Sequence, residues 1–146
     1  MIRILSLDGG GIKGVLTAEI VVGIESLIKE ITSNPNARIG DYFDLIAGTS
    51  TGGILTCGYL TPSSDGAIYN TKYSATEIVQ LYVEHGKDIF SKNTKSKWKT
   101  FFGLARPEYS TNGLDMISSK FFGDLQLVDL TKPCLIPSYD TERREC

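Results

Sequence analysis

The length of the chain, 146 residues, fits one domain with a substantial core, because a chain of this size removes roughly two-thirds of its surface from water on folding. Hydrophobic residues make up 41% of the chain and charged residues 22%, which excludes an intrinsically disordered protein and an integral membrane protein. The net charge of -2 excludes a general electrostatic attraction for nucleic acid, so we expect no nucleic-acid partner.

The N-terminus and the cysteines predict a cytoplasmic protein. Met1 is followed directly by a short apolar run, without the basic segment, long apolar stretch and cleavage site of a signal peptide. Cys57, Cys134 and Cys146 are odd in number and far apart, which is typical of a reduced, intracellular fold. No apolar run reaches the length of about 18 residues that spans a bilayer, so we expect no transmembrane segment and only peripheral membrane contact.

The first half of the chain alternates between strand-like and helix-like segments. Residues 2–7 form an apolar run that ends at three glycines, which predicts a buried strand. The next segment predicts an amphipathic helix, because large apolar residues recur at mostly three- and four-residue spacing (Leu16, Ile20, Ile24, Leu27, Ile28, Ile31) with polar residues between them (Glu19, Glu25, Lys29, Glu30). Residues 43–47 then predict a strand and residues 54–60 a helix. This order predicts an α/β fold with a mostly parallel sheet flanked by helices.

The second half contains two more predicted helices and one more predicted strand. After a polar loop at 61–73, Ser74-x-x-Glu77 is a capping box that begins a helix, and Gly86 suits its C-terminal end. Thr111-Asn112 can cap a further helix that runs toward Gly123. Residues 133–137 predict a strand.

Gly48-x-Ser50-x-Gly52 lies between a predicted strand and a predicted helix. A nucleophilic serine needs a sharp turn that lifts its hydroxyl off the sheet, and glycines before and after it make room for that turn. The helix that follows directs backbone N–H groups and a partial positive charge toward an oxyanion. The alternative is a structural glycine-rich turn with a solvated serine.

Residues 8–14, Asp-Gly-Gly-Gly-Ile-Lys-Gly, also lie between a strand and a helix. Successive glycines free the backbone to direct several N–H groups at one point, which suits a phosphate or the oxyanion of a tetrahedral intermediate. The segment is not a Walker phosphate loop, because Lys13 precedes the last glycine and no Lys-Ser or Lys-Thr follows. A dinucleotide-binding loop fits badly. It requires an acidic residue at the end of a second strand, and the acidic residue near that position, Glu30, lies in a predicted helix. We expect Lys13 to be a solvated loop cation.

Taken together, the two glycine-rich segments resemble the patatin-like phospholipase family. Residues 8–14 resemble its oxyanion loop, and residues 48–53, Gly-Thr-Ser-Thr-Gly-Gly, resemble its nucleophile elbow. The resemblance continues through residues 42–47, 73–78 and 136–140, so it covers most of the chain. It implies that residues 1–146 are the N-terminal portion of a single patatin-like phospholipase domain, incomplete at its C-terminus.

The resemblance also implies a chemistry: a lipid acyl hydrolase of the phospholipase A or lysophospholipase type, without metal or cofactor. Its substrates would be lipid acyl esters at a membrane or micelle surface. Ser50 would attack the ester carbonyl and an aspartate, without a histidine, would take the proton of the serine. The expected oxyanion donors are the N–H groups of Gly10 and Gly11, with those of Gly9 and Thr51 in addition.

The catalytic aspartate of the family lies in an Asp-Gly-Gly or Asp-Gly-Ala motif well downstream of the nucleophile, and we expect it beyond residue 146. Asp65-Gly66-Ala67 matches the letters, but it follows Ser50 by only fifteen positions in a polar loop, so we interpret it as a coincidence. Asp8 and Asp44 flank the two glycine-rich segments and are expected to hold turns by hydrogen bonds to nearby backbone. The chain alone is therefore expected to be inactive.

The chain has one histidine, His85. Ser50, Asp65 and His85 follow one another in the same chain order as the Ser-Asp-His triad of α/β-hydrolases. His85 lies near the end of a predicted helix and not on a loop after a late strand, so we interpret it as a helix-terminal histidine favoured by the helix dipole. The tyrosines follow no single spacing, and we assign them only packing roles.

A basic and aromatic segment, with Lys92, Lys95, Lys97 and Lys99 around Trp98 and with Phe101 and Phe102 beyond it, is suited to anionic lipid headgroups. A solvated loop whose aromatic side chains pack into the core explains it equally well.

Two alternatives to a hydrolase also stay open. One is a non-catalytic lipid-binding fragment with an open, partly apolar sheet edge that favours association. The other is an actin-like sugar kinase, in which the glycine-rich loop would join two antiparallel strands and bind phosphate.

Overall fold

The computed structural model describes residues 1–64, 70–90, 118–140 and 143–144. A three-stranded parallel sheet lies at its centre, in the order β1-β2-β3, with strands Ile4–Leu7 (β1), Leu45–Gly48 (β2) and Cys134–Leu135 (β3). Leu7 pairs with Gly48 and Ala47 with Leu135, so the three strands end near the same edge of the sheet. This arrangement confirms the predicted α/β fold.

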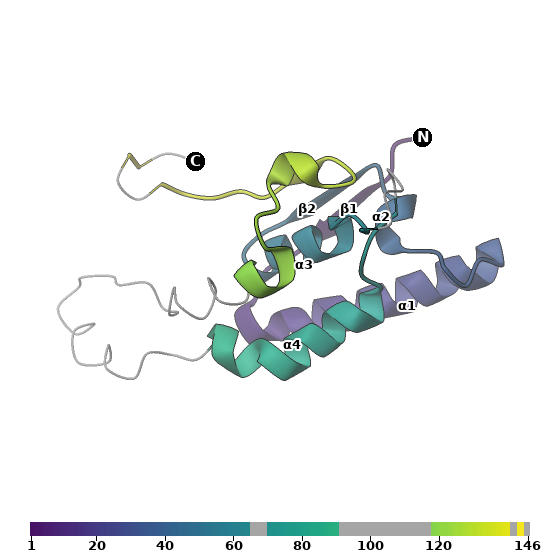
Figure 1. Cartoon of the computed structure of the whole chain (residues 1–146), viewed down its shortest axis with the longest axis horizontal. Helices are drawn as coiled ribbons and strands as arrows, with labels where there is room; N and C mark the ends of the chain where they lie inside the picture. The colour runs from purple at the N-terminus through teal and green to yellow at the C-terminus, as the bar shows by residue number, and fades with distance from the viewer. Residues whose placement is uncertain (65–69, 91–117, 141–142, 145–146) are drawn as a thin grey trace.

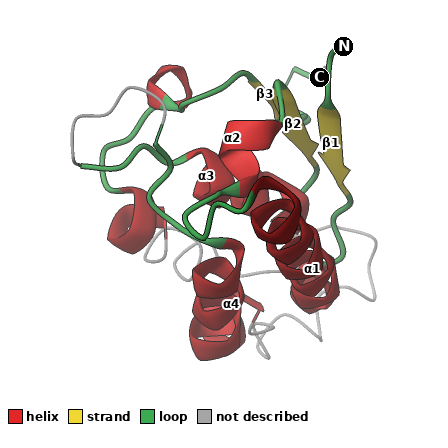
Figure 2. Ribbon diagram, turned by 90° about the vertical axis from the view of Figure 1, so that its right-hand side faces the viewer, coloured by secondary structure: helices red, strands yellow, loops and turns green. Residues whose placement is uncertain are grey.

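The helices follow the strands in alternation (Figure 1). Those whose bounds lie within the described residues are η1 (Gly11–Lys13), α1 (Gly14–Thr32), α2 (Ile39–Tyr42), α3 (Thr51–Leu60), α4 (Ala75–Phe90) and η4 (Leu127–Asp129). Figure 2 shows α1, α3 and α4 on one side of the sheet. Alternation along β1 agrees with this layering, because Leu7 is buried beneath the helices whereas Ile4 is 61% exposed.

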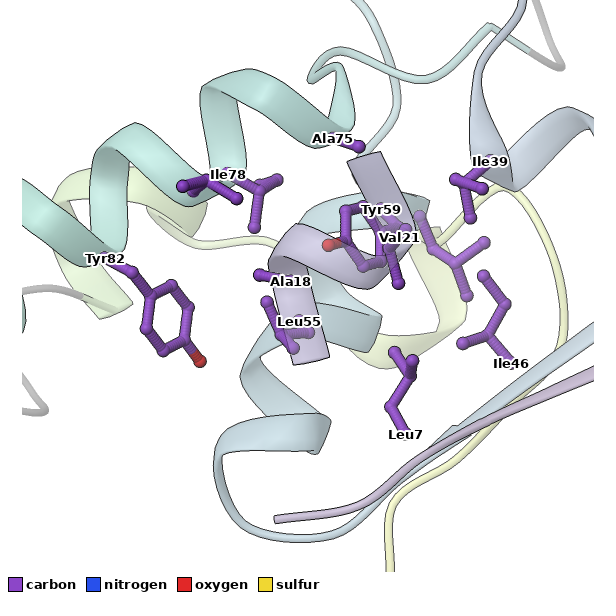
Figure 3. Close-up of a cluster of buried hydrophobic side chains, with 12 residues drawn as sticks. Leu7, Ala18, Val21, Ile39, Ile46, Leu55, Tyr59, Ala75, Ile78 and Tyr82 are labelled. Atoms are coloured by element: carbon purple, nitrogen blue, oxygen red, sulfur yellow. The ribbon is translucent and has the colours of Figure 1, made fainter. Parts of the chain in front are cut away.

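The core lies between the sheet and these three helices (Figure 3). It brings together buried side chains from five elements: Leu7, Ile46, Ala18, Val21, Leu55, Tyr59, Ile78 and Tyr82. Full burial of a large apolar side chain contributes about 1.5–3 kcal/mol. The packing fixes α3 and α4 beside the ends of β1 and β2, where both glycine-rich segments lie.

Helix α1 forms where the sequence predicts it, but the predicted apolar face is confirmed only in part: Ile24 and Ile28 are partly buried and pack against the core, whereas the other four members of the set do not. The face toward the core consists of small residues and one carboxylate: Gly14, Ala18, Val21 and Glu25. The large apolar residues at positions 16, 20, 27 and 31 are exposed by 58–81%. Small side chains on the inner face let α1 approach α3 closely, and a cluster of larger residues there would hold the two helices apart.

Glu25 is 2% exposed, although its place in the pattern suggested a solvated position. Its Oε2 atom accepts the backbone N–H groups of Ile39 and Ala75, both at 3.2 Å. These are the first residues of α2 and α4, so one carboxylate satisfies an N–H group at the start of two helices. Lys29 Nζ lies 2.6 Å from Glu25 Oε1 and balances the charge.

The predicted ends of the helices are partly confirmed. Ser74 Oγ accepts the N–H of Glu77 and the N–H of Ser74 donates to Glu77 Oε2, which is the predicted capping box. Gly86 does not end this helix, because α4 continues to Phe90. Residues 118–122 are helical and end at Gly123, whose φ of 57° suits glycine. Residues 111–117 and the basic, aromatic segment lie outside the described residues.

None of the helices in the described ranges combines the length and the apolar character needed to cross a bilayer.

Candidate active site

Ser50 lies at the junction of β2 and α3, where the chain reverses from strand to helix. Its φ of 53° and ψ of -120° place a non-glycine residue in a strained conformation, which costs about 1–3 kcal/mol. The side chain is exposed, whereas Gly48 and Thr51 on either side of it are buried. The turn therefore lifts the Ser50 hydroxyl off the carboxyl edge of the sheet.

Gly48 and Gly52 are required by close backbone approaches in this turn. A Cβ atom at Gly48 would lie 2.1 Å from the carbonyl oxygen of Gly52. A Cβ atom at Gly52 would lie 2.0 Å from the carbonyl oxygen of Leu7, at the end of β1. Neither position has room for a side chain, so both glycines of the predicted Gly-x-Ser-x-Gly pattern are needed for the observed path of the backbone.

The glycine-rich segment after β1 lies directly against the serine turn. A Cβ atom at Gly9 would lie 2.6 Å from the carbonyl oxygen of Thr49 and 2.9 Å from Cβ of Ser50. Gly11, with a φ of 57°, turns the chain from this segment into η1 and α1. The two segments that the sequence singled out thus meet in space, although about 40 residues separate Gly9 from Thr49.

Two threonine hydroxyls join the segments. Gly9 N–H donates to Oγ1 of Thr49 at 3.0 Å, and Gly10 N–H donates to Oγ1 of Thr51 at 3.2 Å. Thr51 is 2% exposed, so its hydrogen bond with Gly10 is shielded from solvent on one side. The threonines on either side of Ser50 therefore fix the position of the glycine segment relative to the serine.

The N–H groups of Gly11 and Thr51 differ from those of Gly9 and Gly10. Within the described part of the chain, neither of these two N–H groups has a hydrogen-bond acceptor. Thr51 N–H belongs to the first turn of α3, where backbone N–H groups have no partner inside the helix and carry the positive end of its dipole. Neither N–H group is therefore engaged by another described residue of the chain.

Tyr82 contributes to the site from α4, a role that sequence reasoning missed because it assigned every tyrosine to packing. The side chain is 3% exposed, and its hydroxyl donates to the carbonyl oxygen of Thr51 at 2.9 Å. Burial raises the pKa of the Tyr82 hydroxyl, so it stays protonated and able to donate. No spacing in the sequence links residues 51 and 82.

Neither of the two aspartates that flank the glycine-rich segments forms a hydrogen bond with Ser50 in the described structure. Asp44 lies at the opposite end of β2 from Ser50, where its Oδ2 accepts the N–H of Arg3 at 2.7 Å. Asp8 is exposed and forms no hydrogen bond or ion pair with another described residue, so the expected turn hydrogen bond is not found. Asp65-Gly66-Ala67 lies outside the described residues.

His85 belongs to a different set of contacts from Ser50. Its Nε2 lies 3.2 Å from Lys120 Nζ and 4.0 Å from Glu84 Oε2, and its ring lies 5.4 Å from that of Phe121. His85 is inside α4 and not on a loop, because the helix continues beyond it. In the ranges that the structure describes, no three residues of the kinds that bind metal ions come together.

The glycine-rich segment also differs from the phosphate loop of an actin-like kinase. That alternative required two antiparallel strands on either side of the loop. Here β1 pairs in parallel with β2, and the loop continues into η1 and the 19-residue helix α1. The local backbone is that of a strand-to-helix turn.

Comparisons with known proteins agree with the geometry. Residues 5–145 match the family described as Patatin-like phospholipase. Patatin-like protein 4 of Arabidopsis thaliana is 34% identical over 146 residues, covering 98% of this chain and 35% of its own length. Patatin-1-Kuras 2 of Solanum tuberosum is 36% identical over 140 residues, covering 96% of this chain and 35% of its own length. The chain thus spans about a third of the length of the curated relatives it matches, and it belongs to the patatin-like phospholipase family.

Proposed function

We propose that this chain carries the nucleophile and the oxyanion site of a serine-dependent lipid acyl hydrolase, of the phospholipase A or lysophospholipase type. The observation that supports this most strongly is the contact between the two turns at Ser50. Ser50, exposed on a strained strand-to-helix turn, lies against Gly9 of the second turn, so closely that a Cβ atom at Gly9 would be 2.9 Å from Cβ of Ser50. Family membership supports lipid acyl esters, met at a membrane or micelle surface, as the substrate class.

In the proposed reaction, the Ser50 oxygen bonds to the ester carbonyl carbon as its proton passes to a base. The tetrahedral intermediate carries a negative oxygen, which backbone N–H groups stabilise. The carbon–oxygen bond to the leaving alcohol then breaks, and the base returns the proton to that alcohol. Water hydrolyses the acyl-serine by the same steps and releases the fatty acid.

Among the four predicted donors, Gly11 and Thr51 are the ones whose N–H groups have no acceptor within the described residues. We assign them to the oxyanion. Gly9 and Gly10 already donate to the threonine hydroxyls and so hold the segment in place. Loss of one oxyanion donor typically lowers the rate by about 10²–10³-fold, so the choice between these pairs has a measurable consequence.

We place the base, an aspartate, beyond residue 146, with the chain as the N-terminal portion of a single domain. The relatives are about three times as long as the part that this chain matches, which supports this placement. The mechanism requires no cofactor. A non-catalytic, lipid-binding role for the 146-residue chain by itself is the alternative, and it predicts vesicle binding without ester hydrolysis by that chain.

The test compares the 146-residue chain with a form extended by its natural continuation, using p-nitrophenyl fatty acyl esters and phospholipid vesicles. We expect the extended form to hydrolyse both, Ser50→Ala to abolish hydrolysis, and His85→Ala to leave it unchanged. A fluorophosphonate should label Ser50 in the extended form. Equal turnover by the 146-residue chain would place the base within residues 1–146, and the absence of labelling in the extended form would contradict the proposed function.

A further inference from the structure

Tyr82 and Tyr59 are two buried tyrosines of the same core that differ in one respect (Figure 3). Tyr82 is 3% exposed and its hydroxyl donates to the Thr51 carbonyl oxygen at 2.9 Å. Tyr59 is 1% exposed, and within the described residues its hydroxyl has no hydrogen-bond partner. The hydroxyl of Tyr82 therefore acts on a defined atom, whereas that of Tyr59 does not.

The atom that Tyr82 binds belongs to the residue next to the nucleophile. Thr51 begins α3, its N–H has no acceptor among the described residues, and its Oγ1 accepts the N–H of Gly10 at 3.2 Å. Gly14 presses on the same residue, since a Cβ atom there would lie 2.9 Å from Thr51 Oγ1 and 3.6 Å from the Tyr82 ring. A displacement of Thr51 would move both the start of α3 and the glycine segment.

We propose that Tyr82 is a positioning residue for the oxyanion site, acting through Thr51. The proposal rests on the proposed hydrolase function and deepens it. Tyr82 acts through Thr51, because its hydroxyl donates to the Thr51 carbonyl oxygen and so fixes the first turn of α3. Fixing that turn fixes the direction of Thr51 N–H and, through Thr51 Oγ1, the path of the glycine segment. Donors that are held in place before the reaction stabilise an oxyanion without reorganising at the moment of reaction.

The matched variants are Tyr82→Phe and Tyr59→Phe, which each remove one buried hydroxyl and keep the ring. In the extended form, we expect Tyr82→Phe to lower kcat for a p-nitrophenyl ester about tenfold, less than the 10²–10³-fold typical of a lost donor, because the donors remain but are less well oriented. We expect KM to change less than twofold. Tyr59→Phe should leave both kinetic parameters unchanged.

A second readout is independent of hydrolysis and uses the 146-residue chain. Amide hydrogen exchange, followed by nuclear magnetic resonance, reports how often the hydrogen bond of Gly10 N–H opens. Tyr82→Phe should speed exchange at Gly10 several-fold, as should Thr51→Val, which lacks the hydroxyl. Thr51→Ser keeps the hydroxyl and should restore slow exchange. Tyr59→Phe should leave the Gly10 exchange rate unchanged.

The two readouts separate the possible failures. Unchanged Gly10 exchange together with an unchanged kcat in Tyr82→Phe would overturn the positioning role, even if the variant were less stable. Equal effects of Tyr82→Phe and Tyr59→Phe would overturn it too, because a general loss of packing would then explain both. If the extended form hydrolyses no ester, the proposed function fails, while the exchange measurement still decides whether Tyr82 orders Gly10 through Thr51.

Discussion

Both faces of α1 carry apolar residues, but one face is buried and the other is exposed. The inner face carries Gly14, Ala18 and Val21, which are buried, and the outer face carries Leu16 and Ile20, which are more than 60% exposed. In the first turns of α1, the buried face carries the smaller side chains and the exposed face the larger ones. The inner face contacts the start of α3 beside Ser50, where only small residues fit, as the approach of Gly14 to Thr51 shows. The difference teaches that the close approach to Thr51 limits the size of the residue at the start of α1.

The largest effect that tests this comparison is expected at Glu25, the one charged residue of the inner face. Glu25→Ala leaves two buried N–H groups, of Ile39 and Ala75, without an acceptor, and each such loss costs about 1–3 kcal/mol. We expect the free energy of unfolding to fall by about 3 kcal/mol in urea titrations, with Glu25→Gln losing less because an oxygen acceptor remains.

Glu30→Ala is the matched control on the same helix, because Glu30 is exposed. It should change the free energy of unfolding by less than about 0.5 kcal/mol, as is usual for surface substitutions. Equal effects at positions 25 and 30 would show that the inner face of α1 is not where we place it.

The two glycines of α1 give the next largest contrast. In Gly14→Ala the new methyl group meets Thr51 Oγ1 at 2.9 Å and Thr51 Cβ at 3.0 Å, so we expect a loss of about 1–3 kcal/mol from overpacking. In Gly23→Ala the methyl group meets no atom within 4 Å, and the higher helix propensity of alanine should stabilise the protein by about 0.5–1 kcal/mol. Thermal unfolding of the two variants measures both signs. A stabilising Gly14→Ala would contradict the close approach of α1 to the serine turn.

A smaller effect is expected where α4 begins beside the inner face of α1. Ser74→Ala removes the cap of the Glu77 N–H and should cost about 1 kcal/mol at pH 7. Hydrogen bonds from the backbone and side chain of Ser74 lower the pKa of Glu77, so this carboxylate stabilises the fold above its ordinary pKa and loses the effect as the pH falls through its lower folded pKa. Below pH about 4 the cost of Ser74→Ala should therefore shrink. A constant difference in urea titrations at pH 7 and 3.5 would exclude the contribution of Glu77.

The smallest effect on folding is expected on the outer face of α1. Ile20 is 66% exposed, so Ile20→Gln should change the free energy of unfolding by less than about 0.5 kcal/mol. The same substitution should weaken self-association of the chain in sedimentation experiments, because a row of exposed large apolar side chains favours contact between molecules. A loss of several kcal/mol in Ile20→Gln would mean that this face is packed within the monomer.

Much of the fold could be predicted because local signals carry it. The strands at 4–7 and 45–48 follow from short apolar runs that end at glycines, and the start of α4 follows from its capping box. The two glycine-rich segments meet because β1 and β2 are neighbouring parallel strands that end at one edge of the sheet. Each of these features depends on residues close together in the sequence or on simple topology.

The features that escaped prediction depend on contacts between distant segments. Periodicity places residues 16, 20, 27 and 31 on one face of α1, but it cannot say which of two apolar faces another element covers. The burial of Glu25 requires the starts of α2 and α4 to meet α1, and the role of Tyr82 requires α4 to lie against the start of α3. Contacts between elements that are distant in the sequence cannot be predicted from a local sequence pattern.

The structure of a phosphonate adduct tests the central claim most directly, because phosphonylated Ser50 holds its tetrahedral phosphorus and polar phosphoryl oxygen where the oxyanion of an ester would form. In a crystal of the extended form, we expect that oxygen to lie about 2.7–3.1 Å from the backbone nitrogens of Gly11 and Thr51. An oxygen that points into solvent, away from both nitrogens, would contradict the account, because the two turns would then form no common site.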